Sequence, residues 1–226
     1  MNALFTHFVQ DIAPHAEALY ILGDFFEYWA GDDDLGDPFH VAITTALADL
    51  AAHGTRVYLM FGNRDFLLSD AFMRAAHATL LPDPSRIDLY GVPTLLMHGD
   101  TLCTDDVAYQ EFRRMVRGVE WQRNFLAQSL VQRKAQIDGL RKKSALEKSH
   151  KTEAIMDVNP EAVENVLRSH AYPRLIHGHT HRPAKHIHRI DAHACERWVL
   201  GDWYTEASYL RCDATGCETR NVTVPV

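Results

Sequence analysis

The chain has 226 residues, is 46% hydrophobic and carries a formal net charge of −7, which is the composition of an ordinary folded domain. It contains neither a run of about 18 apolar residues nor a basic N-terminal segment followed by an apolar one, so we expect no membrane-spanning helix and no signal peptide. The four cysteines form no Cys-x-x-Cys pair, and we expect reduced thiols, with a Cys212–Cys217 bridge across a hairpin as the alternative.

The predicted elements alternate between helices and short strands. Residues 1–16 have the apolar spacing of an amphipathic helix, and a second helix is predicted around residues 38–53. Each precedes a short apolar run that is typical of a buried strand. Residues 107–170 have a helical pattern, and residues 173–226 return to short strands. We therefore predict an α/β fold, with residues 1–106 and 171–226 as its core and residues 107–170 as a helical cap.

The charge of the chain is concentrated in the predicted cap. Residues 107–151 contain eleven Lys and Arg residues against four Asp and Glu residues, a net +7 that leaves −14 for the remainder. Carboxylates gathered at a cation site explain part of the acidic remainder, whereas the basic segment predicts an anionic partner. We do not expect nucleic acid to be that partner, because the whole chain is acidic and the segment lacks a base-stacking or groove-reading motif.

Four apolar runs end in residues that can bind a metal. Three of them, residues 19–22, 57–61 and 95–97, lead into Gly-Asp, Gly-Asn and His-Gly-Asp, and the fourth, residues 175–176, leads into His-Gly-His-Thr-His. Strand ends deliver functional groups to one edge of a sheet, so these side chains are expected to meet. The expected ligands are Asp24, Asn63, His98, His179 and His181. Hard oxygens mixed with imidazoles suit Mn, Fe or Zn better than Ca or Mg.

Other residues near these motifs receive different interpretations. The acidic run Asp32–Asp34 is interpreted as a solvated loop, and residues 186–188 as part of a surface strand. His177 is expected to point to the opposite face of its strand from the metal ligands. Asp65 and Asp100 are expected to orient ligands rather than to bind metal themselves.

The order of the motifs resembles the calcineurin-like metallophosphoesterases, whose pattern is Asp-x-His, Gly-Asp, Gly-Asn-(His/Arg)-(Asp/Glu), His and Gly-His-x-His. Within that superfamily, the chain most resembles the UDP-2,3-diacylglucosamine hydrolases of lipid A synthesis. The likeness covers essentially the whole chain, in residues 23–27, 29–34, 62–67, 97–106, 154–159 and 177–183. It implies a β-sandwich flanked by helices, two Mn²⁺ ions, and hydrolysis of UDP-2,3-diacylglucosamine to UMP and 2,3-diacylglucosamine 1-phosphate.

The resemblance also implies roles for individual residues. Asp24 would bridge the two metals, His181 would bind the first metal, and the second would be completed by Asn63, His98 and His179. Arg64 stands where many members of the superfamily have a His general acid. Because a guanidinium keeps its proton, Arg64 is expected to bind phosphoryl charge, with an ion pair to Asp65 as the alternative. The implied catalytic residues are Asp24, Asn63, Arg64 and His98, and the implied substrate contacts are Asn63, Arg64, Asp106, Ser144, Lys148, Lys151 and His179.

One part of the family pattern is missing. The family opens with a strand that ends in Asp-x-His and supplies two more ligands of the first metal, whereas here His7 and Asp11 are the early candidates and lie in a predicted helix. The first metal site is therefore expected to be incomplete. We expect a start codon assigned too far downstream, and the alternative is a truncated protein.

The predicted cap combines a basic side with an apolar stripe. The stripe consists of Trp121, Phe125, Leu126, Leu130, Ile137 and Leu140. This combination suits an acylated anionic substrate at a membrane surface, although such a stripe can also pack on a core. The resemblance favours the first interpretation and implies a peripheral protein on the cytoplasmic face of the inner membrane, without an obligate protein partner. Two alternatives stay open: a phosphoesterase for a soluble ester, and a truncated form that binds metal and lipid without turnover.

Overall fold

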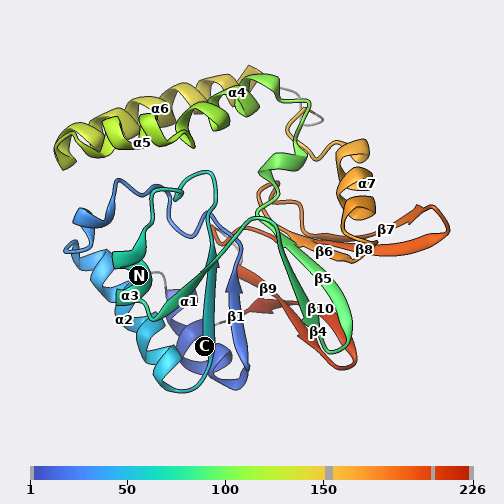
Figure 1. Ribbon diagram of the computed structural model, residues 1–226. Coiled ribbons are helices and arrows are strands. Elements are labelled where there is room, and N and C mark those ends of the chain that lie inside the picture. The colour runs from blue at the N-terminus through green and yellow to red at the C-terminus, as the bar shows by residue number, and fades with distance from the viewer. Residues whose placement is uncertain (1–2, 151–154, 205–206, 224–226) are drawn as a thin grey trace.

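A computed structural model of the chain describes residues 3–150, 155–204 and 207–223, and three sheets form its centre (Figure 1). The first sheet is parallel, in the order β1-β2-β3. The second is mixed, in the order β4-β5-β6-β8-β7, and the third is the antiparallel hairpin β9-β10. The strands are β1 (Ala18–Ile21), β2 (Arg56–Met60), β3 (Ala78–Leu81), β4 (Ser85–Leu89), β5 (Val92–Met97), β6 (Arg174–His177), β7 (Ala184–Ile190), β8 (His193–Val199), β9 (Ala207–Asp213) and β10 (Gly216–Val222).

Helices cover the outer faces of this sandwich, and three of them lie apart from the sheets, across the top of Figure 1. These three are α4 (Val107–Val116), α5 (Val119–Leu126) and α6 (Leu130–His150), which we call the cap helices. The others are α1 (Ala3–His7), η1 (Phe8–Ile12), η2 (Ala13–His15), η3 (Asp32–Asp34), α2 (Pro38–Ala52), α3 (Asp70–Ala75), η4 (Asp100–Leu102) and α7 (Pro160–Ser169). Among the described residues, no helix combines the length and apolar character needed to cross a membrane.

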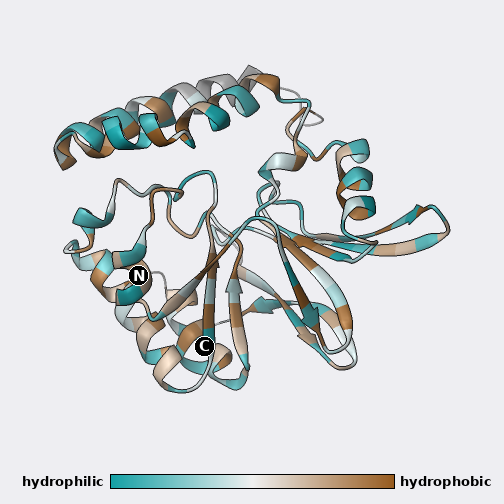
Figure 2. Cartoon of the chain, viewed as in Figure 1, coloured by the Kyte–Doolittle hydropathy of each residue, from teal (hydrophilic) through white to brown (hydrophobic). Residues whose placement is uncertain are grey.

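The buried apolar residues form three clusters, which define the layers. One joins Met60 of the first sheet and Leu96 of the second with Leu210 of the third, which packs against them, and therefore fills the space between the sheets. The second joins the first sheet to α1, α2 and α3, and the third joins β5 and β6 to α7 through Val163 and Leu167. Figure 2 shows the hydrophobic positions on the strands and mostly hydrophilic ones on the cap helices. The α/β expectation is confirmed.

The first helical segment and α2 agree with the sequence pattern. The predicted helix at 38–53 is α2, where the Asp37 side chain accepts a hydrogen bond from the Phe39 N–H and caps the first turn. The N-terminal segment is helical over the described residues 3–15, but it changes from α-helical to π-helical hydrogen bonding at Phe8. Phe8 and Val9 are buried there, as the amphipathic pattern predicted.

The interpretation of Asp32–Asp34 as a solvated loop is wrong for Asp32 and Asp34. Asp32 accepts hydrogen bonds from Ser69 and from the Phe72 N–H, at the start of α3. Asp33 and Asp34 form ion pairs with Arg133 and Lys134 of α6, and Asp34 is buried. Asp32 and Asp34 are shielded from solvent by a helix N-terminus and by a cap cation about 100 residues away in the chain, whereas the Asp33 side chain stays 58% exposed beside Arg133.

The apolar stripe of the cap divides between the core and the solvent. Phe125 is buried, and Trp121 and Ile137 pack beside it on the cluster of the first sheet. Leu126 and Leu140 remain 42% and 39% exposed. The boundaries of the predicted cap, 107–170, stay a prediction; within them α7 packs on the second sheet and not with the cap helices.

Candidate metal centre

Two glycines allow the loops after β1 and β2 to touch. Gly23 has φ +87°, and a Cβ atom built on it would lie 2.5 Å from the Gly62 backbone. A Cβ atom on Gly62 would lie 2.1 Å from the Asp24 nitrogen. No side chain fits at either position, so the Gly-Asp and Gly-Asn motifs bring two backbones into direct contact and place Asp24 beside Asn63.

Asp65 holds these two loops together. Its carboxylate is fully buried and accepts hydrogen bonds from the backbone N–H groups of Gly62 at 2.7 Å, Phe25 at 2.6 Å and Asp24 at 3.3 Å. Burial, followed by the neighbouring Asp24 charge, raises the pKa of Asp65 to about 6. The structure therefore gives Asp65 the orienting contacts that the sequence interpretation expected of it.

Asp24, His98 and His179 form the one group of three or more His, Cys, Asp or Glu side chains, within the described part of the chain, whose ligand atoms all lie within 4.8 Å of one another. Asn63 joins this group, because its Oδ1 lies 3.2 Å from His98 Nε2 and 2.8 Å from His179 Nδ1. Four of the five expected ligands, from the ends of four strands, therefore meet at one place. His98 is 1% exposed, so that its ring is held rigidly.

The hydrogen bonds of His98 fit a cation site. Its Nδ1 lies 2.8 Å from the Leu22 carbonyl oxygen, which can only accept, so Nδ1 carries a proton and the neutral ring has its lone pair on Nε2. That lone pair faces the Asn63 Oδ1 and, at 3.8 Å, the Asp24 Oδ1, both of which are acceptors too. Three acceptors converging on one point are satisfied by a metal ion, and the carbonyl contact fixes the ring as outer hydrogen bonds do at metal sites.

Arg64 lies at the edge of this group. Its Nε is 3.6 Å from Asp24 Oδ2, and its Nη1 donates to Glu27 at 3.0 Å and to the Tyr204 hydroxyl. Burial alone would lower the pKa of Arg64, but Asp24, Tyr204 and Glu27 outweigh it and raise the pKa. The alternative of an ion pair between Arg64 and Asp65 is not what the structure shows, because the Asp65 carboxylate is occupied by backbone N–H groups.

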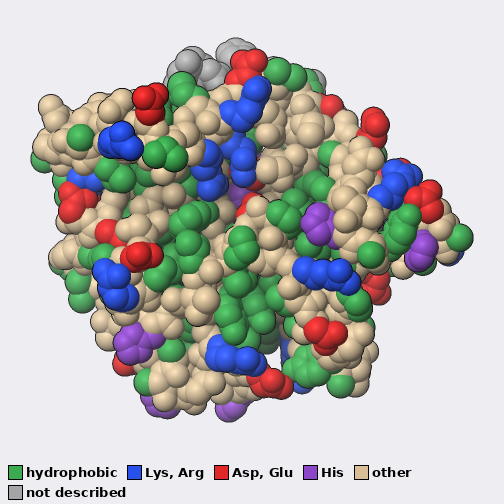
Figure 3. Space-filling view, in the orientation of Figure 1, with side chains coloured by type: hydrophobic (Ala, Val, Ile, Leu, Met, Phe, Trp, Pro, Cys, Tyr) green, Lys and Arg blue, Asp and Glu red, His purple; other side chains and the backbone are tan. Residues whose placement is uncertain are grey.

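The cap helices contact the site through two further ion pairs. Arg141 of α6 donates to Glu27 at 3.0 Å, which places Glu27 between the Arg141 and Arg64 guanidinium groups. Arg113 of α4 donates at 2.7 Å to the fully buried Asp100, which also accepts from the Tyr109 hydroxyl at 2.7 Å. The Tyr109 ring lies 5.7 Å from the His179 ring, measured between centroids. Lys and Arg side chains gather near the cap on the face shown in Figure 3.

The remaining predicted site residues are more dispersed. His181 lies outside the group of ligands, with its Nδ1 3.5 Å from Asp202 Oδ2. Asp106 caps α4 by accepting from the Tyr109 N–H at 3.1 Å, and Ser144 is exposed on α6. The predicted substrate contacts at Lys148 and Lys151 lie outside the described residues or side chains.

Sequence reasoning missed several residues of this region. Asp202 follows Gly201 directly after the strand β8, which is the same strand-Gly-Asp signal that identified Asp24. Tyr109 and Arg113 are spaced by four residues on α4 and were therefore on one face of a predictable helix. Glu27 and Arg141 carried no local signal, because they are 114 residues apart in the chain.

The fold and the site define a class of protein. Three packed sheets carry Asp, Asn and His ligands at their strand ends, and the family described as calcineurin-like phosphoesterase matches residues 2–183. The chain belongs to this family. Members of the family bind divalent metal ions, which agrees with the convergence of Asp24, Asn63, His98 and His179.

Sequence identities to individual relatives show which members of this family the chain resembles. The chain is 55% identical to a UDP-2,3-diacylglucosamine hydrolase of Aromatoleum aromaticum, over 94% of this chain and 86% of that protein. It is 51% identical to a protein of the same name from Pseudomonas aeruginosa, over 94% of this chain and 88% of that one. A third, from Hahella chejuensis, is 46% identical over 98% and 91% of the two chains. Within the phosphoesterases, the chain thus shares a family with the UDP-2,3-diacylglucosamine hydrolases.

Proposed function

We propose that the chain hydrolyses the pyrophosphate bond of UDP-2,3-diacylglucosamine in lipid A biosynthesis and releases UMP and 2,3-diacylglucosamine 1-phosphate. The observation that carries the proposal is the meeting of Asp24, Asn63, His98 and His179 beside the Arg64 guanidinium. The names of relatives at 46–55% identity support the choice of substrate.

We infer that the metal is Mn²⁺ and that the chain binds two ions when its sites are complete. Asp24, Asn63, His98 and His179 would hold one of them, and Asp24 and His181 would contribute to the other. Imidazole nitrogens mixed with carboxylate and amide oxygens suit this ion. When bound, the metal supplies Lewis-acid stabilisation of the charge on phosphoryl oxygens. The neutral Asn63 carbonyl adds a ligand without adding charge that would repel the substrate.

Arg64 is the protein side chain that we propose stabilises the charge of the phosphoryl group. Its guanidinium stays protonated at every working pH, so it binds and stabilises phosphoryl charge instead of donating a proton. Glu27 and Tyr204 orient it from the side away from Asp24. Asp65 keeps Asp24 and the Asn63 loop in register with that guanidinium through their backbone N–H groups.

The cap is proposed to bind the acylated half of the substrate. Asp106, Ser144, Lys148 and Lys151 would contact the glucosamine and its phosphate, and the exposed apolar residues Leu126 and Leu140 support a role in acyl-chain binding. Exposed apolar groups next to basic ones favour a peripheral position on an anionic membrane surface, in this proposal the cytoplasmic face of the inner membrane.

A comparison of two substrates tests this function. Mn²⁺-loaded protein is assayed with UDP-2,3-diacylglucosamine in mixed micelles and with a soluble bis-phosphodiester, while elemental analysis reports the metal bound per chain. We expect UMP release from the lipid substrate, abolished in Asp24→Asn and retained in the surface control Asp88→Asn, whose carboxylate caps an exposed turn. A preference for the soluble ester would overturn the choice of substrate, and metal binding without turnover of either would overturn the catalytic role.

A further inference from the structure

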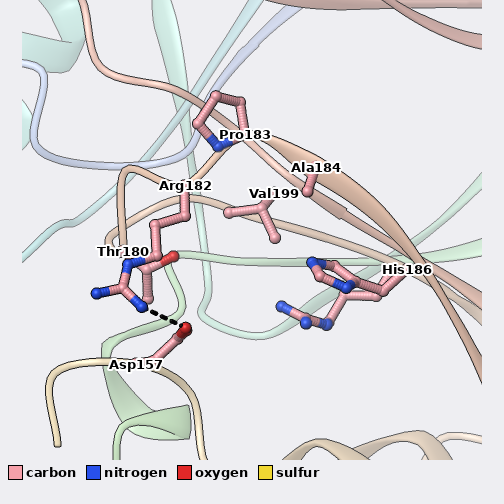
Figure 4. A pocket seen from close by; sticks show the side chains of 8 residues that line it. Asp157, Thr180, Arg182, Pro183, Ala184, His186 and Val199 are labelled. Carbon is pink, nitrogen blue, oxygen red and sulfur yellow. Dashed lines mark hydrogen bonds and ion pairs between the residues drawn. The ribbon is translucent and has the colours of Figure 1, made fainter. Parts of the chain in front are cut away.

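A cavity of about 270 Å³ lies next to the His179–His181 loop and is separate from the group of metal ligands (Figure 4). Strands β7 and β8 form its floor, and the loop before α7 forms one wall. Its volume is just below the usual range of small-molecule sites, which begins at about 300 Å³.

The strand register assigns a defined set of side chains to this floor. His186 pairs with Arg197, and Ala184 pairs with Val199, so all four share one face of the β7-β8 hairpin. Figure 4 shows His186 and Thr180 on opposite sides of Val199. Cys195 lies on the same face of the hairpin and belongs to the apolar cluster under α7. α7 therefore covers the apolar end of this face, and the cavity lies at its polar end.

Arg197 is a buried cation without an acidic partner. It is 7% exposed, and within the described residues no carboxylate forms an ion pair with it. Its Nε donates to His188 Nε2 at 3.0 Å, and its Nη1 lies 3.1 Å from His177 Nε2. His177 Nδ1 faces the Gly178 carbonyl oxygen at 3.0 Å, so its proton is on Nδ1 and Nε2 accepts from Arg197. Neutral rings thus satisfy part of the guanidinium, and Asp157 is the one carboxylate of the described residues that acts on its charge, at longer range than an ion pair.

Two further features of the lining favour an anion. The Thr180 hydroxyl oxygen is buried and has no hydrogen-bond partner, which is costly unless a ligand supplies one. The one acidic residue of the lining, Asp157, is already used, because its Oδ2 accepts from Arg182 at 2.7 Å and its Oδ1 from the Val158 N–H at 2.7 Å. Buried charges in proteins are normally paired, so the missing counter-charge is expected from outside the chain.

We propose that this cavity is a second anion site, which binds a phosphate group through the Arg197 guanidinium, the Thr180 hydroxyl and the His186 ring. The phosphate belongs either to free inorganic phosphate or to a phosphate monoester such as a nucleoside 5′-monophosphate. An arginine held by neutral imidazole acceptors, together with one free hydroxyl, provides the charge-assisted hydrogen bonds that phosphate oxygens accept. The site is independent of the reaction proposed above, because none of its residues is needed to bind the metal ions there.

Calorimetric titration of the metal-free full chain with inorganic phosphate tests the site, since removing divalent ions with EDTA prevents phosphate from binding to a metal. We expect saturable binding that is at least tenfold weaker in Arg197→Met and severalfold weaker in the near-isosteric Thr180→Val. The control is Arg189→Met, an exposed arginine on the opposite face of the same strand, which should bind like the wild type. Circular dichroism establishes whether each variant is folded. If Arg197→Met does not fold, the affinity of Thr180→Val decides the test.

A second titration, with uridine 5′-monophosphate, distinguishes the two sources of phosphate. Binding at least tenfold tighter than inorganic phosphate, and lost in the same variants, supports a site for the phosphate ester. Equal affinities support a site for the free anion. The proposal is overturned if the wild type does not bind either probe at millimolar concentration, or if binding is unchanged in both Arg197→Met and Thr180→Val.

Discussion

Replacing Asp65 by alanine removes the acceptor that holds the two metal-site loops together. The buried Gly62 N–H and the part-buried Phe25 N–H, now at 2.7 and 2.6 Å from the carboxylate, would be left without a partner. Each such loss costs about 1–3 kcal/mol, or about 2–6 kcal/mol for the pair. The variant also removes a desolvated charge, whose burial raises the pKa of Asp65 to about 6, so we expect the lower part of that range, about 2–4 kcal/mol.

Urea unfolding at pH 7, followed by circular dichroism, measures this loss. The matched control is Asp88→Ala, which removes a carboxylate that accepts a single backbone hydrogen bond, from Gly91 at 2.7 Å in an exposed turn. The control should lose less than about 1 kcal/mol, since water replaces the missing acceptor. Mn²⁺ affinity should fall at least tenfold in Asp65→Ala and stay constant in the control. Equal destabilisation of the two variants, or unchanged metal binding, would refute the role given to Asp65.

Three further predictions concern the site, the thiols and the cap. Arg64→Lys should lower kcat at least tenfold while Mn²⁺ affinity is retained, because a lysine keeps the charge but loses the guanidinium geometry; steady-state kinetics with metal titration checks this. Iodoacetamide should modify Cys217 with a pH midpoint near 7 and leave Cys103 unmodified, as read out by peptide mass spectrometry. The hydrogen bond from Cys212 and the Arg174 guanidinium lower the pKa of Cys217 to about 7. Burial raises the pKa of Cys103 to about 12. Arg133→Met should cost about 1–3 kcal/mol of unfolding free energy and speed proteolysis within α6, because it removes the 2.6 Å hydrogen bond that Arg133 donates to the Ala30 carbonyl.

The sequence predicted the parts of this protein that depend on local pattern. Asp24, Asn63, His98 and His179 each follow an apolar run, and the ends of such strands meet at one edge, so their convergence could be inferred before any contact was known. The pairing of Glu27 with Arg141 could not be inferred in this way, because it depends on how the cap helices pack on the core and produces no periodic pattern in the sequence. Asp32 and Asp34 were misread for the same reason, since the Phe72 N–H and Lys134 that pair with them are distant in sequence.

In the folded chain, part of the basic charge of residues 107–151 is neutralised by acids of the core. Four cations of the basic segment pair with acids of the core: Arg113 with Asp100, Arg133 with Asp33, Lys134 with Asp34, and Arg141 with Glu27. Part of the basic charge therefore attaches the cap to the core and is not available to an anionic partner. Glu27, whose side chain is 45% exposed, lies between the Arg141 and Arg64 guanidinium groups. In the proposed function, a phosphate on Arg64 would compete with the Glu27 carboxylate, so substrate binding would be linked to the Glu27–Arg141 ion pair that attaches the cap.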